Sequence, residues 1–163
     1  MAYDMNRFSR PEDTNTWTVE WAARQWGQDV ALTTADIMST YGMLCARRKY
    51  EDLSTQFGFS VTNYDEAELN YMEWEKLAQR AQTVYDSLPK DKQDSYFEIV
   101  LHAVLAGKGV YEIYSKAAIG KEYASQHSYR GDEMAAEAKA AFQTDQQLSQ
   151  RYHSVNGGKW NGM

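Results

Sequence analysis

Residues 64–88 carry the most regular pattern of apolar positions in the chain. Apolar and aromatic side chains recur there in alternating steps of four and three, at Ala67, Tyr71, Trp74, Ala78, Ala81, Tyr85 and Leu88. This spacing places them on one face of a helix of about six turns. Asn63, with Glu66 three residues later, predicts how that helix begins, and Pro89 predicts where it ends.

Two further helices are predicted before this segment. The first covers residues 14–26, where Trp17 and Trp21 share a face and Gly27 offers a stop. The second begins at Thr33, with Asp36 in the position of a capping box. Its apolar stripe consists of Ile37, Tyr41, Leu44 and Cys45. Residues 50–62 are less regular, and we expect a loop there that is packed by Leu53, Phe57 and Phe59.

The second half of the chain predicts one long helical region and one final helix. The long region covers residues 91–127, and Gly107 and Gly109 predict a kink or break within it. The final helix covers residues 132–152 and could restart at Thr144 and Asp145. No segment shows the alternation typical of a strand. The sequence therefore predicts an all-α fold, an antiparallel bundle of five to six helices that forms one domain over residues 1–163.

Charge and composition exclude several classes of partner. The net charge of −6 and the pI of about 5.1 disfavour nucleic acid, since an acidic surface repels phosphate backbones. No apolar run approaches the roughly 20 residues that cross a bilayer, so no membrane partner is expected. Cys45 is the only cysteine, which excludes an internal disulfide.

Candidate chemistry is sparse along the chain. A di-iron site in a helical bundle needs a Glu three residues before a His. None of the three histidines meets this condition: Ile99 precedes His102, Ala124 precedes His127 and Gln150 precedes His153. We therefore expect no cofactor. The acidic side chains near residue 65 stand where a helix begins, and we interpret them as dipole-stabilising residues and not as glycosidase carboxylates.

Seven segments, taken in order, carry a resemblance to one family. They are WAARQWG (21–27), ARRKYEDL (46–53), FSVTNYDEAE (59–68), QDSYFEIVLHAV (93–104), VYEIY (110–114), KEYASQ (121–126) and GGKWNGM (157–163). In this order and separation the chain resembles the helical domain that follows the catalytic barrel in glycoside hydrolase family 115, the xylan α-1,2-glucuronidases. The resemblance covers nearly the whole chain.

The resemblance implies that the chain is a non-catalytic scaffold or dimerisation domain cut from a larger enzyme. Such a parent would remove glucuronic or 4-O-methylglucuronic acid from xylan, would be secreted and thus extracellular, and could be a homodimer. Its partners within the parent would be a (β/α)8 catalytic barrel upstream and a β-sandwich downstream. The acidic residues of the family's inverting mechanism lie in the barrel, so no catalytic residue is assigned here.

Contacts to a neighbouring domain or to substrate are expected at two places. They involve Arg47, Arg48, Lys49, Asn63, Tyr64, Lys159 and Trp160. The chain also departs from the family pattern at several positions. It has Cys45-Ala46 where the family has Asn-Gly. It has Ala103 where the family has Pro, Leu105 where the family has Lys, and Gly162 where the family has His. These differences weaken any substrate contact inferred by position.

Two alternatives to the scaffold domain stay open. The chain could be a free-standing helical interaction module, which Met1 and a self-contained core would suit. It could also bind carbohydrate through exposed aromatic side chains. Trp21 and Trp74 are expected in the core, whereas Trp160, in a glycine-flanked tail, is a candidate anchor for an interface.

Overall fold

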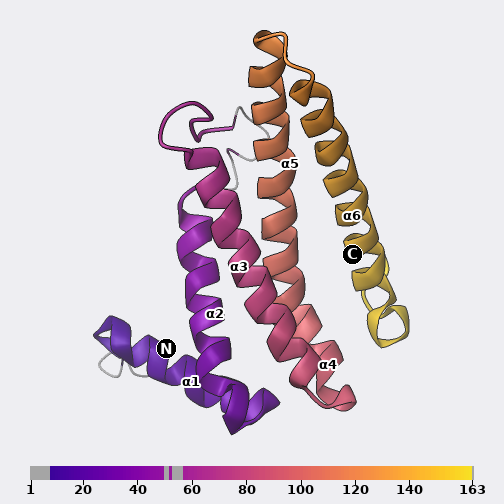
Figure 1. Cartoon of the computed structure of the whole chain (residues 1–163). Helices are drawn as coiled ribbons and strands as arrows, with labels where there is room; N and C mark the ends of the chain where they lie inside the picture. Colours follow the sequence, from indigo (N-terminus) through magenta and orange to yellow (C-terminus); the bar gives the residue numbers. More distant parts are fainter. Residues whose placement is uncertain (1–7, 50–51, 53–56, 163) are drawn as a thin grey trace.

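The structure is a computed structural model that describes residues 8–49, 52 and 57–162 (Figure 1). Within these residues all regular structure is helical, which confirms the predicted all-α fold. The elements are α1 (Pro11–Trp26), α2 (Gln28–Ala46), α3 (Glu66–Ser87), α4 (Lys90–Tyr96), the π-helical segment η3 (Phe97–Leu101), α5 (His102–Ser125) and α6 (Arg130–Gly158).

Four long rods run side by side, and each is antiparallel to the next along the chain (Figure 1). They are α2, α3, the continuous rod of α4, η3 and α5, and finally α6. Helix α3 packs against both α2 and α5, whereas α6 packs along α5, and α1 crosses the end of α2. The bundle is therefore an open row of helices in which α3 and α5 hold the central places.

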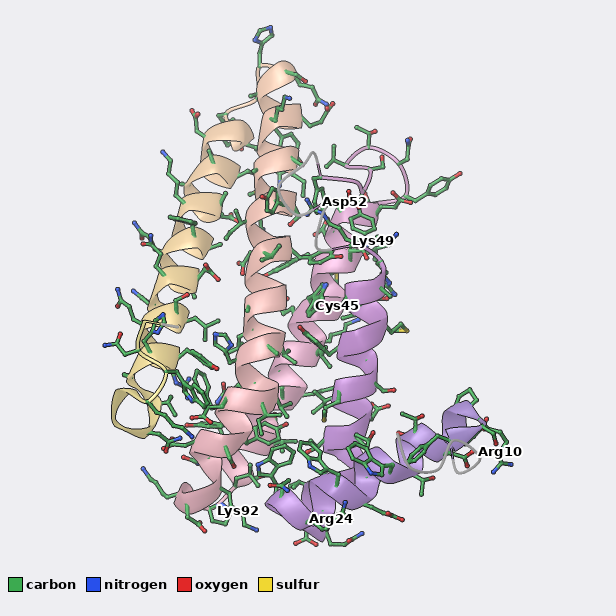
Figure 2. The ribbon with its side chains drawn as sticks, turned by 180° about the vertical axis from the view of Figure 1, so that it is seen from behind. Arg10, Arg24, Cys45, Lys49, Asp52 and Lys92 are labelled. Carbon is green, nitrogen blue, oxygen red and sulfur yellow. The ribbon has the colours of Figure 1, made fainter. Side chains whose placement is uncertain are left out.

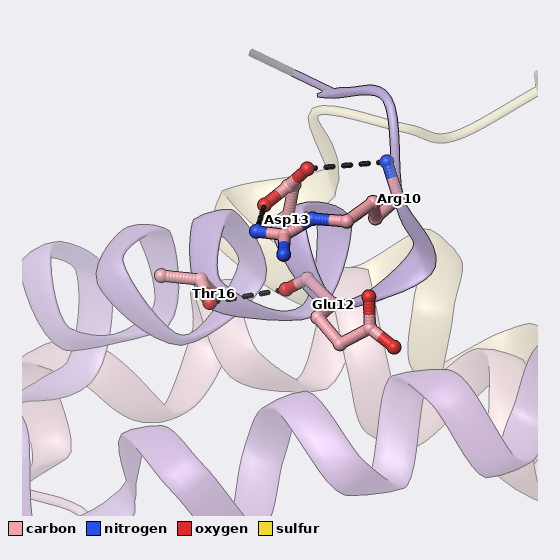
Figure 3. A network of polar contacts seen from close by, with 4 residues as sticks. All are labelled: Arg10, Glu12, Asp13 and Thr16. Atoms are coloured by element: carbon pink, nitrogen blue, oxygen red, sulfur yellow. Dashed lines mark hydrogen bonds and ion pairs between the residues drawn. The ribbon is translucent and has the colours of Figure 1, made fainter.

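Helix α1 begins at Pro11, three residues earlier than the sequence predicts. Proline suits the first turn because its fixed φ is helical and its missing N–H leaves no donor unpaired. The Asp13 carboxylate accepts hydrogen bonds from the backbone N–H and the guanidinium of Arg10, both at 3.1 Å (Figure 3). This pairing lowers the pKa of Asp13. It fixes the helix start before Thr14.

A single residue, Gly27, links α1 to α2. Its φ of 113° lies in a region that residues with a Cβ avoid, and the predicted stop at Gly27 is confirmed. The predicted start of α2 at Thr33 is wrong, because the helix begins directly at Gln28. The sharp turn keeps Trp26 buried, where its indole N–H donates to the Ser95 hydroxyl at 3.0 Å and so ties α1 to α4.

The predicted apolar face of residues 64–88 is confirmed as the centre of the core. Trp74 is 1 % exposed, and Ala67, Ala78, Ala81 and Leu88 are also buried. The predicted first turn is wrong in detail, since Ser60 and not Asn63 organises it. The Ser60 hydroxyl accepts from the Asn63 N–H at 2.9 Å, and the Glu66 carboxylate accepts from the Ser60 N–H at 2.9 Å.

The predicted break at Gly107 and Gly109 is wrong, since α5 runs through both residues without interruption. Gly107 is instead a point of close packing: a Cβ added there would lie 2.3 Å from Cζ3 of Trp74. The irregularity of this rod is the π-helical segment Phe97–Leu101, which no pattern in the sequence predicts.

Helix α6 is continuous at the predicted restart, where the Thr144 hydroxyl donates to the Ala140 carbonyl at 3.1 Å. The restart is therefore wrong. The predicted end of regular helix in the tail is confirmed, because Val155, Asn156 and Gly157 depart from helical φ and ψ. Phe57 and Phe59 pack against the core as predicted, whereas Leu53 lies outside the described residues.

Candidate functional site

An open groove lies between α2 and α5, on the face opposite to that of Figure 1. Its volume is about 880 Å³, and Trp74 of α3 contributes to its lining. Small residues make up much of its walls: Gly42, Cys45 and Ala46 from α2, and Ala103, Ala106 and Gly107 from α5. Figure 2 labels Cys45 and Lys49 on the α2 side. Helices α2 and α5 both pack on α3. The side chains that α2 and α5 turn toward each other are small and leave the space between them open.

Aromatic rings line the deepest part of this groove. The Trp74 ring centroid lies 5.3 Å from that of Tyr111 and 5.8 Å from that of Tyr41. Burial raises the pKa of Tyr111, and burial raises the pKa of Tyr41 to about 12. The indole N–H of Trp74 and the hydroxyl of Tyr111 are buried, and neither has a hydrogen bond of good geometry within the described residues. Both polar atoms are closed to solvent, so neither faces the open space of the groove.

Arg48 and Lys49 line one end of the groove, and the three residues of the basic run 47–49 have different environments. Arg47 donates to the Asn70 side chain at 2.9 Å and pairs with Glu73, which ties α2 to α3. The Arg48 guanidinium is buried over the Tyr114 ring at 4.7 Å and donates to the Asp52 carbonyl at 2.7 Å. Lys49 is exposed and lines the groove. Arg47 and Arg48 thus hold this end of the domain together.

His102 lines the groove and also lies against α6. Its ring is half-buried and contacts the Tyr152 ring in a tilted arrangement, with centroids 4.3 Å apart. Burial lowers its pKa, the nearby Asp145 carboxylate raises it, and His153 lowers it further. These contacts make His102 part of the packing between α5 and α6.

The site residues predicted from sequence do not come together in one place. Arg47, Arg48 and Lys49 lie at the end of the bundle where α2 ends and α3 begins, together with Asn63 and Tyr64. Tyr64 is 90 % exposed, and its φ of 57° is in the left-handed region. This end of the domain therefore presents both an exposed aromatic ring and an exposed lysine.

The other predicted pair, Lys159 and Trp160, follows the end of α6 and lies near η3. The Asn156 side chain donates to the Glu98 carboxylate at 2.6 Å, and Nδ1 of His153 lies 3.0 Å from the Trp160 carbonyl. These contacts return the tail to its own bundle. The Trp160 ring is half-buried there, with its indole N–H shielded from solvent.

The described residues show few arrangements suited to catalysis. In this part of the chain no group of three or more His, Cys, Asp and Glu side chains is placed to hold a metal ion. Glu66, one of the acidic residues near the start of α3, is engaged by the Ser60 backbone. No described helix is both long enough and apolar enough to cross a membrane.

Sequence reasoning identified the basic end of the groove but not the groove itself. The signal was present in the small residues that interrupt the apolar stripes, such as Gly42, Ala103 and Ala106. In a sequence such residues look like weak core positions. Only the placement of α2 and α5 on α3 shows that they share one open face.

Comparison with protein families finds a match to part of the chain. The model of glycosyl hydrolase family 115 matches residues 1–52, which include α1, α2 and the basic run. The resemblance inferred from the sequence is thereby confirmed over this segment, in which the chain is similar to the family 115 model. Comparison with curated proteins finds no similar sequence.

Proposed function

We propose that this chain is a non-catalytic scaffold domain of an α-glucuronidase that removes glucuronic or 4-O-methylglucuronic acid side chains from xylan. The observation that carries the proposal is the family 115 match over residues 1–52. The all-helical bundle supports it, since the resemblance implies a helical domain beside a catalytic barrel. In this proposal the parent enzyme is secreted and contributes a (β/α)8 barrel and a β-sandwich as neighbours, and a homodimer could form through the same chain.

The chemistry of the described residues supports a structural role over a catalytic one. An inverting glycosidase needs an acid and a base about 6.5–9.5 Å apart across a space for water and substrate. Among the described residues, the groove is lined by small and aromatic residues together with Arg48, Lys49 and His102, and none of these carries a carboxylate. We therefore assign the reaction to a separate barrel.

A direct assay tests the non-catalytic role. The purified chain is incubated with aldouronic acids, and released glucuronic acid is measured against a family 115 enzyme as the positive control. The expected result is no release above the blank. Release that scales with the concentration of the chain would refute the scaffold role.

The alternative is a free-standing helical interaction module. One observation favours it: the Trp160 ring is already half-buried within this chain and so gives no support to an interdomain anchor at that residue. The flanking coding sequence separates the two proposals. A reading frame that continues into a barrel on one side and a sandwich on the other supports the scaffold domain, whereas stop codons at both ends support the module.

A further inference from the structure

Helix α6 is attached to the bundle mainly through one neighbour. It packs along α5, and of its residues, all of which the structure describes, only Gly131 and Ala141 are buried. Leu148, Tyr152 and Val155 are partly buried and add apolar contacts near its end. An element with so little buried surface opens at a lower cost in free energy than the core does. Helix α6 can therefore separate from α5 as a unit.

The turn between α5 and α6 holds one residue in an unfavourable conformation. Helix α5 ends in a Schellman motif, in which the Ser128 N–H donates to the Tyr123 carbonyl at 2.9 Å. In the same motif the His127 N–H donates to the Ala124 carbonyl at 3.0 Å. The left-handed position of such a motif is usually glycine, but here it is His127, with a φ of 57°. A residue with a Cβ in this region shifts an equilibrium by about fivefold or more against the closed turn.

An opened turn can continue as helix, because residues 121–130 contain neither proline nor glycine. Helix α6 then points away from its own α5, and the surface it leaves fits the α6 of a second chain. The Lys116–Glu137 ion pair at 2.7 Å re-forms between the chains. So does the close approach of Gly120, whose added Cβ would lie 3.3 Å from the Gly131 carbonyl oxygen. The turn lies beyond the ends of α2 and α3, so these helices do not obstruct a second chain there (Figure 1).

We propose that α6 is an exchange element, and that two copies of this chain form a dimer in which the α6 of each packs on the α5 of the other. A second copy is the partner because the surface that fits α5 is the chain's own α6. Short linkers give effective concentrations of about 1 mM. Since both chains of the dimer lose the strained turn, half-dimerisation falls about 25-fold below this, to roughly tens of micromolar. The proposal holds for a scaffold domain and for a free-standing module, so its failure leaves the proposed function untouched.

Two introduced cysteines distinguish an exchanged dimer from a side-by-side dimer. A Cβ at Gly109 would lie 4.0 Å from the Cβ of Asp145, which suits a disulfide between α5 and α6. Gly109→Cys and Asp145→Cys are combined with Cys45→Ser, which removes the native thiol. The full chain is refolded from urea at about 1 mM, the effective concentration of a short linker, under reducing conditions. Monomer and dimer are separated by size-exclusion chromatography, and each fraction is then oxidised.

Two substitutions at the turn form a matched pair. His127→Gly removes the strain of the closed turn, whereas His127→Ala keeps it and favours the straight helix. Both should fold, since His127 is exposed. His127→Gly should raise the Kd of the dimer by about 25-fold, because two turns are relieved for each dimer that separates. His127→Ala should lower the Kd by about fivefold, the combined gain in helix propensity of two chains.

The expected result is that the oxidised dimer fraction runs as a covalent dimer on a non-reducing gel, while the monomer fraction acquires its disulfide within one chain. A dimer fraction whose disulfides lie within single chains would overturn the proposal, because it would show side-by-side association. Monomer alone at about 1 mM, even with His127→Ala, would also overturn it. A Kd that is equal in the two His127 variants would contradict the role of the strained turn.

Discussion

The close contact between Gly107 and Trp74 can be tested by comparing alanine substitutions at two helical glycines, Gly107 and Gly42, which have different surroundings. In an exposed helix interior, Gly→Ala stabilises by about 1 kcal/mol because alanine loses less backbone entropy on folding. Gly42 of α2 meets this condition, since a Cβ there has no atom within 4 Å. We expect Gly42→Ala to raise the free energy of unfolding by about 0.5–1 kcal/mol.

Gly107→Ala should behave differently because its Cβ would lie 2.3 Å from Cζ3 and 2.5 Å from Cη2 of Trp74. The ring cannot withdraw easily, since it is 1 % exposed and packs against Tyr41 and Tyr111. Overpacking of this kind costs about 1–3 kcal/mol, which offsets or exceeds the gain in helix propensity. The expected gap between Gly107→Ala and Gly42→Ala is therefore about 1–3 kcal/mol.

Urea unfolding followed by far-ultraviolet circular dichroism measures both substitutions, and a double-mutant cycle with Trp74→Leu isolates the contact. Leucine leaves room for the new methyl group, so Gly107→Ala should be neutral or stabilising in that background. The reasoning would be refuted if Gly107→Ala stabilised the original chain as much as Gly42→Ala does. An unchanged effect in the Trp74→Leu background would place the strain elsewhere.

Three further outcomes are expected. Trp74→Ala should lower the free energy of unfolding by about 3–5 kcal/mol in urea melts, and a loss below about 1 kcal/mol would show that the apolar face of α3 is not the core. Stability should fall as the pH drops below about 6.5, because burial lowers the pKa of His102 in the folded chain and the unfolded chain then binds the proton first. His102→Gln should flatten that pH dependence in thermal melts, and an unchanged slope would show that other groups cause it. Trp160→Ala should lower the free energy of unfolding by about 1–2 kcal/mol, more than a substitution in an exposed tail would, because the ring is half-buried. A change within about 0.5 kcal/mol would show that the tail does not stabilise the domain.

Local patterns in the sequence were sufficient for the fold class and for the central helix. The steps of four and three between Ala67 and Leu88 determine which face of α3 is buried, because helical geometry places those positions together whatever surrounds them. Gly27 likewise marks the end of α1, since its positive φ is a property of one residue. The family resemblance was also legible in the sequence over the segment that the comparison matches.

Tertiary packing decided the points at which local signals gave the wrong answer. Gly107 looks like a helix breaker in isolation, but the helix persists because Trp74, distant in the sequence, fills the space where a side chain would stand. The start of α2 at Gln28 depends on the burial of Trp26 beside α4. The groove lies between faces of α2 and α5 that no other described helix covers. Its position depends on how α2, α3 and α5 pack together, so the periodicity of any one of these helices does not encode it.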